Sequence, residues 1–481
     1  MPLILGTNSI KDTGYDVANS LRFNSGSSDD LVYTPSSTGN RRTFTWSVWV
    51  KRSKLGASQF TLFKKEGSGS DTNGNGNADY LGLAYFNSDD TLQVARNQEG
   101  DFVNVKTTRV FRDVSAWYHI IVSIDTTQGT GSNRVRCWIN GTEESLTFTV
   151  TPTQNREFDF NQSGEAHHLG SYGGGSYLDG YLTECVFLDG TAVTGATDFG
   201  EFDSDSPTIW KPKDVSGLSF GTNGFYLDFE NASSLGADVS GNGNNFTVNN
   251  LTSIDQSTDT CTNNFATLNS VAQWDLGGSS VYSEGNLKCV LSSNFGKATS
   301  TIGVTQGKWY MEVKQTAENK PLGNGESVIN VIGDPIYTTS NWNGYAQTFG
   351  LRNHNGYEYT GTAEATSQHS NWTAGDIIGV ALDMDNLRVY FSKNGQWYDG
   401  SGNWDESSPN AYISLSSSYS TYFLCLTLSH DSATETFEVN FGSPSFSISS
   451  GNSDANGYGN FEYSVPSGYY SLNTKNLAEY G

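Results

Sequence analysis

The chain is poor in several residue types, and cysteine is the first of these. Five cysteines in 481 residues form no CxxC or CxxH pair, so the sequence predicts no zinc site. Apolar runs are short, and none approaches the roughly 20 residues of a membrane-spanning helix. The first residues lack the basic region of a signal peptide. We therefore expect synthesis in a reducing compartment, without a cleaved leader and without membrane insertion.

Basic residues are also scarce. The chain has 27 Lys and Arg against 51 Asp and Glu, which gives a formal net charge of −24. Nucleic-acid binding depends on basic side chains that neutralise phosphates, so we expect no nucleic-acid partner. The acidic balance serves solubility. It also suits a salty medium rich in divalent cations, where charges are screened within a few ångströms.

Polar uncharged residues fill the composition instead. Charged residues are 16% and methionines only 3, whereas aromatics reach 13% and glycines number 53. The aromatic content argues against a disordered chain. The mixture is typical of an all-β protein with many tight turns. Three cysteines lie in strand-like runs of the chain and are predicted to be small buried core residues, namely Cys137, Cys185 and Cys425.

The first part of the chain alternates with the period of β-strands. Phe44, Trp46, Val48 and Val50 fall on one face, and Asn140-Gly141 marks a hairpin. Turn residues every 8 to 12 positions predict an antiparallel sandwich. The segments FTWSVWVKRS, WYHIIVSID, VRCWINGTEE and HHLGSYGGGSYLDGYLTECVFLDGTAV follow in this order. They resemble the laminin-G-like, concanavalin-type jelly roll.

The alternation breaks down in residues 206–258. Pro207 and Pro212 interrupt any ladder, and Gly241–Asn245 is rich in turn residues. We predict a packed joint because the segment also carries apolar residues that should pack against one or both sandwiches, namely Trp210, Phe220, Phe225, Tyr226, Leu227 and Phe229. Alternatively, the segment completes a sandwich edge, because DVSGNGN resembles the first hairpin turn of such a jelly roll.

Alternation returns after this segment. Ile378, Val380, Leu382 and Met384 share one face, and Lys393-Asn394-Gly395 forms a hairpin turn. The segments GKWYMEVKQ, GDIIGV and RVYFSKNGQW resemble the SPRY/B30.2 family, another twisted sandwich. We therefore expect two concanavalin-like antiparallel β-sandwiches. The predicted parts are a lead that docks on a partner subunit or on its own domain (1–17), a laminin-G-like jelly roll (18–205), the joint (206–258) and an SPRY-like sandwich (259–481).

The whole order, from the MPLILGTNS lead to the GYYSLNTKNL tail, resembles virion surface proteins of marine tailed bacteriophages. The resemblance implies a non-enzymatic structural protein of the virion, exposed as a tail-fibre or adhesion component. Its implied partners are other virion proteins and a host-surface glycan or receptor. A capsid decoration protein and a polysaccharide depolymerase are the alternatives. A homo-oligomer such as a trimer is expected, although the sequence has neither coiled-coil heptads nor β-helix repeats.

One loop has the composition of a calcium site. Asp71, Asn73, Asn75 and Asp79 place oxygen side chains at alternate positions with glycine between them. The twelfth position of the loop is Gly82, where an EF-hand would need a bidentate Glu. The loop is therefore either a Ca²⁺ site or a solvated hairpin tip, and no other cofactor is predicted.

Loop aromatics are the candidate glycan-binding residues, because sugar rings stack on aromatic faces. Trp342, Tyr345, Tyr357 and Tyr359 lie in one loop-rich stretch of the SPRY-like half. The alternative is that Trp342 and Tyr357 cap the sandwich.

Three carboxylates and two histidines are candidates for catalysis or metal binding. Glu201, Asp203 and Asp205 would share one face of a strand, but they lie beside Pro207 without the apolar pocket that raises a carboxyl pKa. His167 and His168 are adjacent, so on a strand they point to opposite faces and cannot share a metal. The sequence therefore predicts no catalytic residue.

Overall fold

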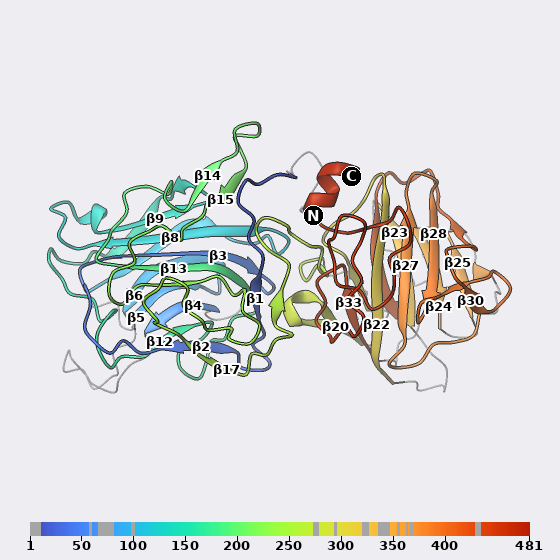
Figure 1. Ribbon diagram of the computed structural model, residues 1–481, viewed down its shortest axis with the longest axis horizontal. Helices are drawn as coiled ribbons and strands as arrows, with labels where there is room; N and C mark the ends of the chain where they lie inside the picture. The colour runs from blue at the N-terminus through green and yellow to red at the C-terminus, as the bar shows by residue number, and fades with distance from the viewer. Residues whose placement is uncertain are drawn as a thin grey trace. The chain divides into compact units, whose positions relative to one another are not determined.

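The computed structural model describes residues 11–56, 60–65, 81–97, 102–272, 279–292, 296–319, 327–334, 347–353, 356–361, 364–365, 369–428 and 434–481. The described residues form two compact units (Figure 1). The first unit is Thr13–Thr262, and the second is Asn263–Gly481 together with Lys11 and Asp12. Both units are built from sheets that are antiparallel apart from the parallel pair β22 (Lys308–Asn319) and β34 (Tyr470–Ser471), so the predicted all-β fold is confirmed. No helix in the described part of the chain has the length and apolarity to span a membrane.

The first sheet of the first unit is antiparallel and has the order β10-β9-β8-β3-β13-β1-β18, with β16 added beside β13. Its centre is the long pair β3 and β13, in which Trp46 lies opposite Phe187. The strands are β1 (Ser20–Phe23), β3 (Thr43–Arg52), β8 (Trp117–Asp125), β9 (Val135–Ile139), β10 (Thr142–Glu143), β13 (Gly180–Asp189), β16 (Phe225–Leu227) and β18 (Gln256–Ser257), and the 3₁₀ turn η2 (Gly131–Arg134) precedes β9.

The second sheet has the order β11-β7-β6-β5-β4-β12-β2-β17. Apolar residues from the inner faces of both sheets form the core, where Trp46 of the first sheet stacks on Phe63 of the second with ring centroids 5.5 Å apart. Cys137 and Cys185 are buried in this core, as predicted. The strands are β2 (Asp30–Tyr33), β4 (Phe60–Lys65), β5 (Leu81–Phe86), β6 (Thr91–Asn97), β7 (Asn104–Val110), β11 (Leu146–Val150), β12 (His167–Leu169) and β17 (Thr247–Asn249).

Residues 206–258 belong to the first unit and complete its sheets. Strand β16 pairs with β13, β17 pairs with β2, and β18 pairs with β1. The segment thus forms sandwich edges, which was the alternative to a separate joint. Only the hairpin of β14 (Gly200–Phe202) and β15 (Trp210–Pro212) forms a small sheet of its own, drawn in green in Figure 1.

The Asp238 side chain organises the turn between β16 and β17. Its Oδ1 accepts the backbone N–H groups of Tyr226 and Ser240, both at 2.9 Å. Its Oδ2 accepts the Ser240 hydroxyl at 2.9 Å and the backbone N–H of Asn244 at 2.8 Å. Gly241 and Gly243 have φ of 90° and 75°, which glycine adopts without steric cost. The DVSGNGNN segment is therefore a structured turn closed by one carboxylate.

The outer face of the first sheet is covered by chain from the same unit. Trp49 and Ile121 of this face pack against Phe199, Trp210 and other apolar residues that follow β13. His119 lies inside this layer, where its ring stacks on Trp49 at 4.6 Å and its Nδ1 accepts the indole N–H of Trp210 at 2.9 Å. Burial lowers the pKa of His119 to about 3, so the imidazole is neutral.

The second unit has two sheets around its own core, which includes Trp309 and Trp372. The larger sheet contains β19 (Ser279–Ser283), β20 (Lys288–Ser292), β22 (Lys308–Asn319), β27 (Ile377–Asp383), β28 (Arg388–Lys393), β29 (Gln396–Tyr398), β30 (Trp404–Glu406), β31 (Ile413–Ser414), β33 (Thr434–Asn440) and β34 (Tyr470–Ser471). The smaller contains β21 (Lys297–Thr299), β23 (Ser327–Gly333), β24 (Thr348–Arg352), β25 (Tyr357–Thr360), β26 (Glu364–Ala365) and β32 (Tyr422–Leu428). Helical turns are η3 (Glu284–Asn286) and α1 (Thr474–Tyr480).

The residues after β33 cover the outer face of the larger sheet. Phe461, which is fully buried, packs on Tyr310 with ring centroids 5.1 Å apart. Glu312 of β22 fixes this covering segment, because its carboxylate accepts the backbone N–H groups of Glu462 at 3.0 Å and Tyr463 at 2.8 Å. Burial raises the pKa of Glu312 to about 6. At the start of the chain, Lys11 belongs to this unit and pairs with Glu479 at 2.7 Å.

Candidate ligand-binding site

Most of the residues predicted to bind ligands lie outside the described residues. Trp342 and Tyr345 are among them, and so are the calcium-loop residues Asp71, Asn73, Asn75 and Asp79. Glycan stacking and Ca²⁺ binding at these residues therefore stay predictions. In the described part of the chain, no group of three His, Cys, Asp or Glu side chains is placed to hold a metal ion.

The remaining two predicted aromatics lie on β25. Tyr357 begins the strand, and its side chain is outside the described part. Tyr359 is 3% exposed, which leaves its ring almost no surface for stacking on a sugar. The structure thus gives Tyr359 a packing role in the sandwich.

The three carboxylates considered for catalysis, Glu201, Asp203 and Asp205, lie around a turn. Strand β14 ends at Phe202, so Asp203 and Asp205 do not continue it. Oδ1 of Asp203 accepts the backbone N–H groups of Asp205 at 3.0 Å and Ser206 at 2.8 Å, and Oδ2 pairs with Lys211 at 3.3 Å. These contacts, with the Ser206 hydrogen bond foremost, lower the pKa of Asp203. A general acid needs a raised pKa, so Asp203 is placed to stabilise the hairpin.

The two adjacent histidines point to opposite faces of β12, as predicted. His167 packs into the core against Phe160 with ring centroids 4.5 Å apart. His168 directs Nδ1 to Oδ2 of Asp30 at 3.0 Å. Burial lowers the pKa of His167 to about 3, so this imidazole stays neutral inside the core.

Asp30, His168 and Ser171 bring together the residue types of a nucleophilic triad in another arrangement. The Ser171 hydroxyl donates to Oδ2 of Asp30 at 2.7 Å, the same oxygen that His168 contacts. In a triad the histidine lies between the hydroxyl and the carboxylate. Here the hydroxyl and the imidazole both contact the same carboxylate oxygen, and the hydroxyl lies farther from His168 Nδ1, at 3.4 Å. The Asn249 side-chain amide donates to Oδ1 of Asp30 at 2.7 Å. The group therefore ties β2, β12 and β17 together.

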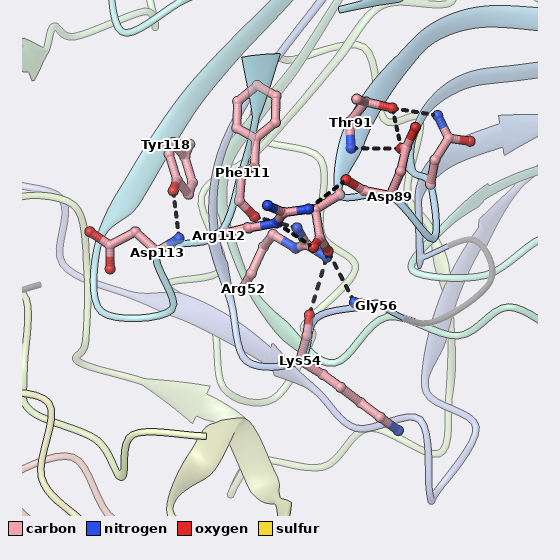
Figure 2. A network of polar contacts seen from close by, with 11 residues as sticks. Arg52, Lys54, Gly56, Asp89, Thr91, Phe111, Arg112, Asp113 and Tyr118 are labelled. Atoms are coloured by element: carbon pink, nitrogen blue, oxygen red, sulfur yellow. Dashed lines mark hydrogen bonds and ion pairs between the residues drawn. The ribbon is translucent and has the colours of Figure 1, made fainter. Parts of the chain in front are cut away.

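A buried ion pair joins the end of β3 to the turn between β5 and β6 (Figure 2). Arg52 is 1% exposed and its Nη2 lies 3.1 Å from Oδ1 of Asp90. The guanidinium also donates to the carbonyl groups of Phe111 and Lys54, and its carbon lies 4.2 Å from the centroid of the Phe86 ring. Burial of two charges is tolerated because each is hydrogen-bonded by fixed neighbours.

The Asp90 carboxylate accepts two further hydrogen bonds (Figure 2). The backbone N–H of Gly56 donates to Oδ1 of Asp90 at 3.0 Å, and Nε of Arg112 donates to Oδ2 at 3.0 Å. Asp90 itself has φ of 64°, a conformation that Asp tolerates better than most residues. This network fixes the end of the sandwich beside strands β5 and β6.

The outward face of the second sheet carries a row of cationic and aromatic side chains. Five residues on consecutive strands are register partners and therefore lie across the sheet on one face. They are His168, Lys64, Gly82, Arg96 and Asn104. Their sequence neighbours Leu169, Phe63, Leu81 and Val105 belong to the core. Because side chains alternate along a strand, the row points away from the core.

The aromatic members lie over and beside this row. A Cβ at Gly82 would be 2.6 Å from Cε1 of Tyr85, so the Tyr85 ring occupies the space that glycine leaves. Nζ of Lys64 lies 5.8 Å from the centroid of this ring and 4.4 Å from that of Tyr172. Lys64, Arg96 and Tyr172 are partly exposed, whereas Tyr85 is 3% exposed. We call Lys64, Tyr85, Arg96 and Tyr172 the basic–aromatic row.

Sequence reasoning missed this row. Lys64 and Arg96 are separated by 31 intervening residues, and their neighbourhood depends on the pairing of β4, β5 and β6. The available signal was the alternation FTLFKK, which places Lys64 opposite to Phe63. Register across three strands was needed to bring Arg96 beside it.

Comparison with known proteins defines the two domains. A sequence profile described as "Concanavalin A-like lectin/glucanases superfamily" matches residues 25–196, and the SPRY domain profile matches residues 301–412. The chain therefore contains a concanavalin-like domain and a SPRY domain. Domains of these kinds are compatible with a binding or adhesion role. No curated protein matches the chain.

Solved structures that are similar to parts of this chain include two SPRY-type domains and a pentraxin. The SPRY domain of human HERC1 is 20% identical and covers 34% of this chain and 96% of its own, with a TM-score of 0.28. A native heptameric SAP-like pentraxin from Limulus polyphemus is 17% identical, over 37% and 80% of the two chains, with a TM-score of 0.26. The TRIM65 PSpry domain is 10% identical, over 36% and 91%, with a TM-score of 0.26.

Proposed function

We propose that this protein is a non-enzymatic structural protein of a tailed-bacteriophage virion. In this proposal it is an exposed tail-fibre or adhesion component that binds host-surface glycan or neighbouring virion proteins. The combination of a concanavalin-like domain and a SPRY domain supports a binding role. The lead, the DVSGNGNN turn and the GYYSLNTKNL tail support the virion assignment through their resemblance to phage surface proteins.

The observation that carries the binding role is the basic–aromatic row. It presents partly exposed cationic and aromatic groups on a sheet face, which is a rigid support for ligand contacts. The buried carboxylates contact fixed neighbours instead. Glu184 accepts the Tyr226 hydroxyl at 2.9 Å, and Glu312 accepts two backbone N–H groups. These contacts support a structural role for both acids.

Imaging of labelled particles tests the location. Purified particles would be decorated with an antibody or a gold label against this protein and viewed by electron microscopy. We expect label on the tail or on fibres that extend from the particle. Label at icosahedral positions on the shell would identify a capsid decoration protein, and its absence from purified particles would contradict the virion assignment.

A cleavage assay tests the non-enzymatic part. Host polysaccharide would be incubated with the wild-type protein and with the variant Asp203→Asn, and new reducing ends would be measured. We expect no release above buffer with either protein. Release by the wild type that disappears in the variant would make the protein a depolymerase and would overturn the proposal.

A further inference from the structure

We infer that the basic–aromatic row binds an acidic glycan, that is, a chain of sugar rings carrying carboxylate or sulfate groups. This inference rests on the proposed binding function and specifies its ligand class. It concerns the outward face of β4, β5 and β6. Its physical basis is the joint placement of two partly exposed cations, Lys64 and Arg96, and the partly exposed ring of Tyr172.

The spacing of the two cations suits a polymer. Lys64 and Arg96 are both register partners of Gly82, so two strand spacings separate their backbones. This corresponds to about 10 Å. Gly82 has no side chain, and the buried Tyr85 ring fills the space beside it. An extended ligand that crosses the strands can therefore contact both cations.

The chemistry of each group favours an anion on a sugar ring. The Arg96 guanidinium can donate two parallel hydrogen bonds to a carboxylate or sulfate, and Lys64 supplies a compact positive charge. The Tyr172 ring lies 4.4 Å from Nζ of Lys64 and comes from the loop after β12, so a sugar ring can stack beside the ammonium group. An anion bound here would also relieve the repulsion between the two cations.

The electrostatics of Lys64 agree with this geometry. Burial, followed by the positive charge of Arg96, lowers the pKa of Lys64 to about 8. Among the described residues, groups that face it include Tyr85 on β5, Tyr172 in the loop after β12, and His168 on β12, which contacts Asp30. A bound anion favours the protonated amine, so ligand binding and protonation of Lys64 strengthen each other.

Direct binding of the full chain to three polymers tests the inference. The probes are polygalacturonate for carboxylates, dextran sulfate for sulfates and unmodified dextran as the neutral control. We expect measurable affinity for at least one charged polymer and an affinity at least tenfold lower for dextran. Equal affinity for all three, or no binding to either charged polymer, would overturn the inference. So would tighter binding to single-stranded DNA, which would favour a nucleic-acid ligand.

Variants locate the site. Lys64→Met, Arg96→Met and Tyr172→Ala should each weaken binding by about tenfold or more, because each removes one recognised group. Lys64→Arg should retain binding, which separates loss of charge from loss of folding. Lys106→Met is the matched control, because this lysine lies on neighbouring β7 and pairs with Asp89 at 3.3 Å. Unchanged binding in the first three variants would place the ligand elsewhere and overturn the inference.

The pH profile supplies a second readout. If the ligand requires protonated Lys64, affinity should fall by about tenfold between pH 7 and pH 9, as the amine loses its proton around pH 8. Lys64→Arg should show no such fall, because arginine stays charged. The same fall in both proteins would exclude Lys64 as the titrating group.

Failure of this inference can be told apart from failure of the proposed function. A protein that labels the virion and adheres to host cells, yet ignores charged polymers, would retain the proposed function and lose the acidic ligand. A protein that binds charged polymers through Lys64 and Arg96, yet is absent from particles, would retain the site and lose the virion assignment.

Discussion

Single buried charges give the sharpest tests at the scale of the residue, and Glu184 is the first. It lies in a β-bulge of β13 with φ of 50°, and the Tyr226 hydroxyl contacts both of its carboxylate oxygens, at 3.0 and 2.9 Å. Burial raises the pKa of Glu184 to about 8 from an ordinary value of 4.5. Between these values the folded state holds a proton that the unfolded state has released. Folding stability is therefore lost as the pH rises through this window.

The variant Glu184→Gln isolates this effect, because glutamine keeps the shape and does not ionise. Urea unfolding at pH 5, 6, 7 and 8 should show that the free energy of unfolding of the variant increases relative to that of the wild type as the pH rises. The gain should be on the order of 2 kcal/mol across the window. Parallel stability profiles of the two proteins would show that Glu184 does not titrate there.

Arg52 and Arg112 form a matched pair, because both contact Asp90. The Arg52 side chain is 1% exposed and that of Arg112 is 60% exposed. Arg52→Met should lower the free energy of unfolding by about 3 kcal/mol, since it leaves a buried carboxylate without its main partner. Arg112→Met should cost less than about 1 kcal/mol. Calorimetry of the full chain measures both, and equal losses would contradict the assigned role of burial.

Residue-scale prediction from sequence succeeded where local pattern was sufficient. Cys137, Cys185 and Cys425 were predicted to be buried because they lie in apolar strand runs, and they are. Arg52 could not be recognised, because KRSK at a strand end has the composition of an exposed segment and Asp90 lies 38 positions away. Tyr359 was predicted to be a loop aromatic for a similar reason, because its strand pairing with Gly350 is not visible in the sequence.

The turn between β16 and β17 provides the test at the scale of the element. Asp238 accepts four hydrogen bonds there, so Asp238→Ala should cost about 2–3 kcal/mol and speed hydrogen exchange at the Tyr226 amide. Asp214→Ala is the control, because Asp214 is exposed and accepts hydrogen bonds from the backbone N–H and the hydroxyl of Ser216. Equal protection of the Tyr226 amide in both variants would show that the turn forms without its carboxylate.

Elements were predicted well where alternation was regular and less well where it was not. Strand β3 followed from Phe44, Trp46 and Val48, which alternate inward. Residues 206–258 did not alternate, because their strands are only two or three residues long. Such short strands are ordered mainly by the sheets with which they pair. The sequence pattern therefore predicted a packed segment but not the strands with which it pairs. The DVSGNGNN motif was the signal for a sandwich edge.

Net charge sets the behaviour of the whole molecule toward a charged ligand. The chain carries −24, although the proposed site is cationic. At low salt the repulsion between protein and polyanion extends about 30 Å, and at 0.1 M salt about 10 Å. We therefore expect the association rate with the charged polymer to increase as salt is added, while dissociation also becomes faster. Stopped-flow measurements test this, and an association rate that falls with salt would indicate that the site dominates the long-range field.

The buried thiols have a practical consequence for site-specific labelling of this protein. All five cysteines are free; Cys137, Cys185, Cys289 and Cys425 are buried, and burial raises the pKa of each thiol. Thiolates are the reactive form, so these sulfurs should react slowly with maleimides. One cysteine introduced at an exposed position would then take up a fluorophore first, and the native residues could stay in place during site-specific labelling.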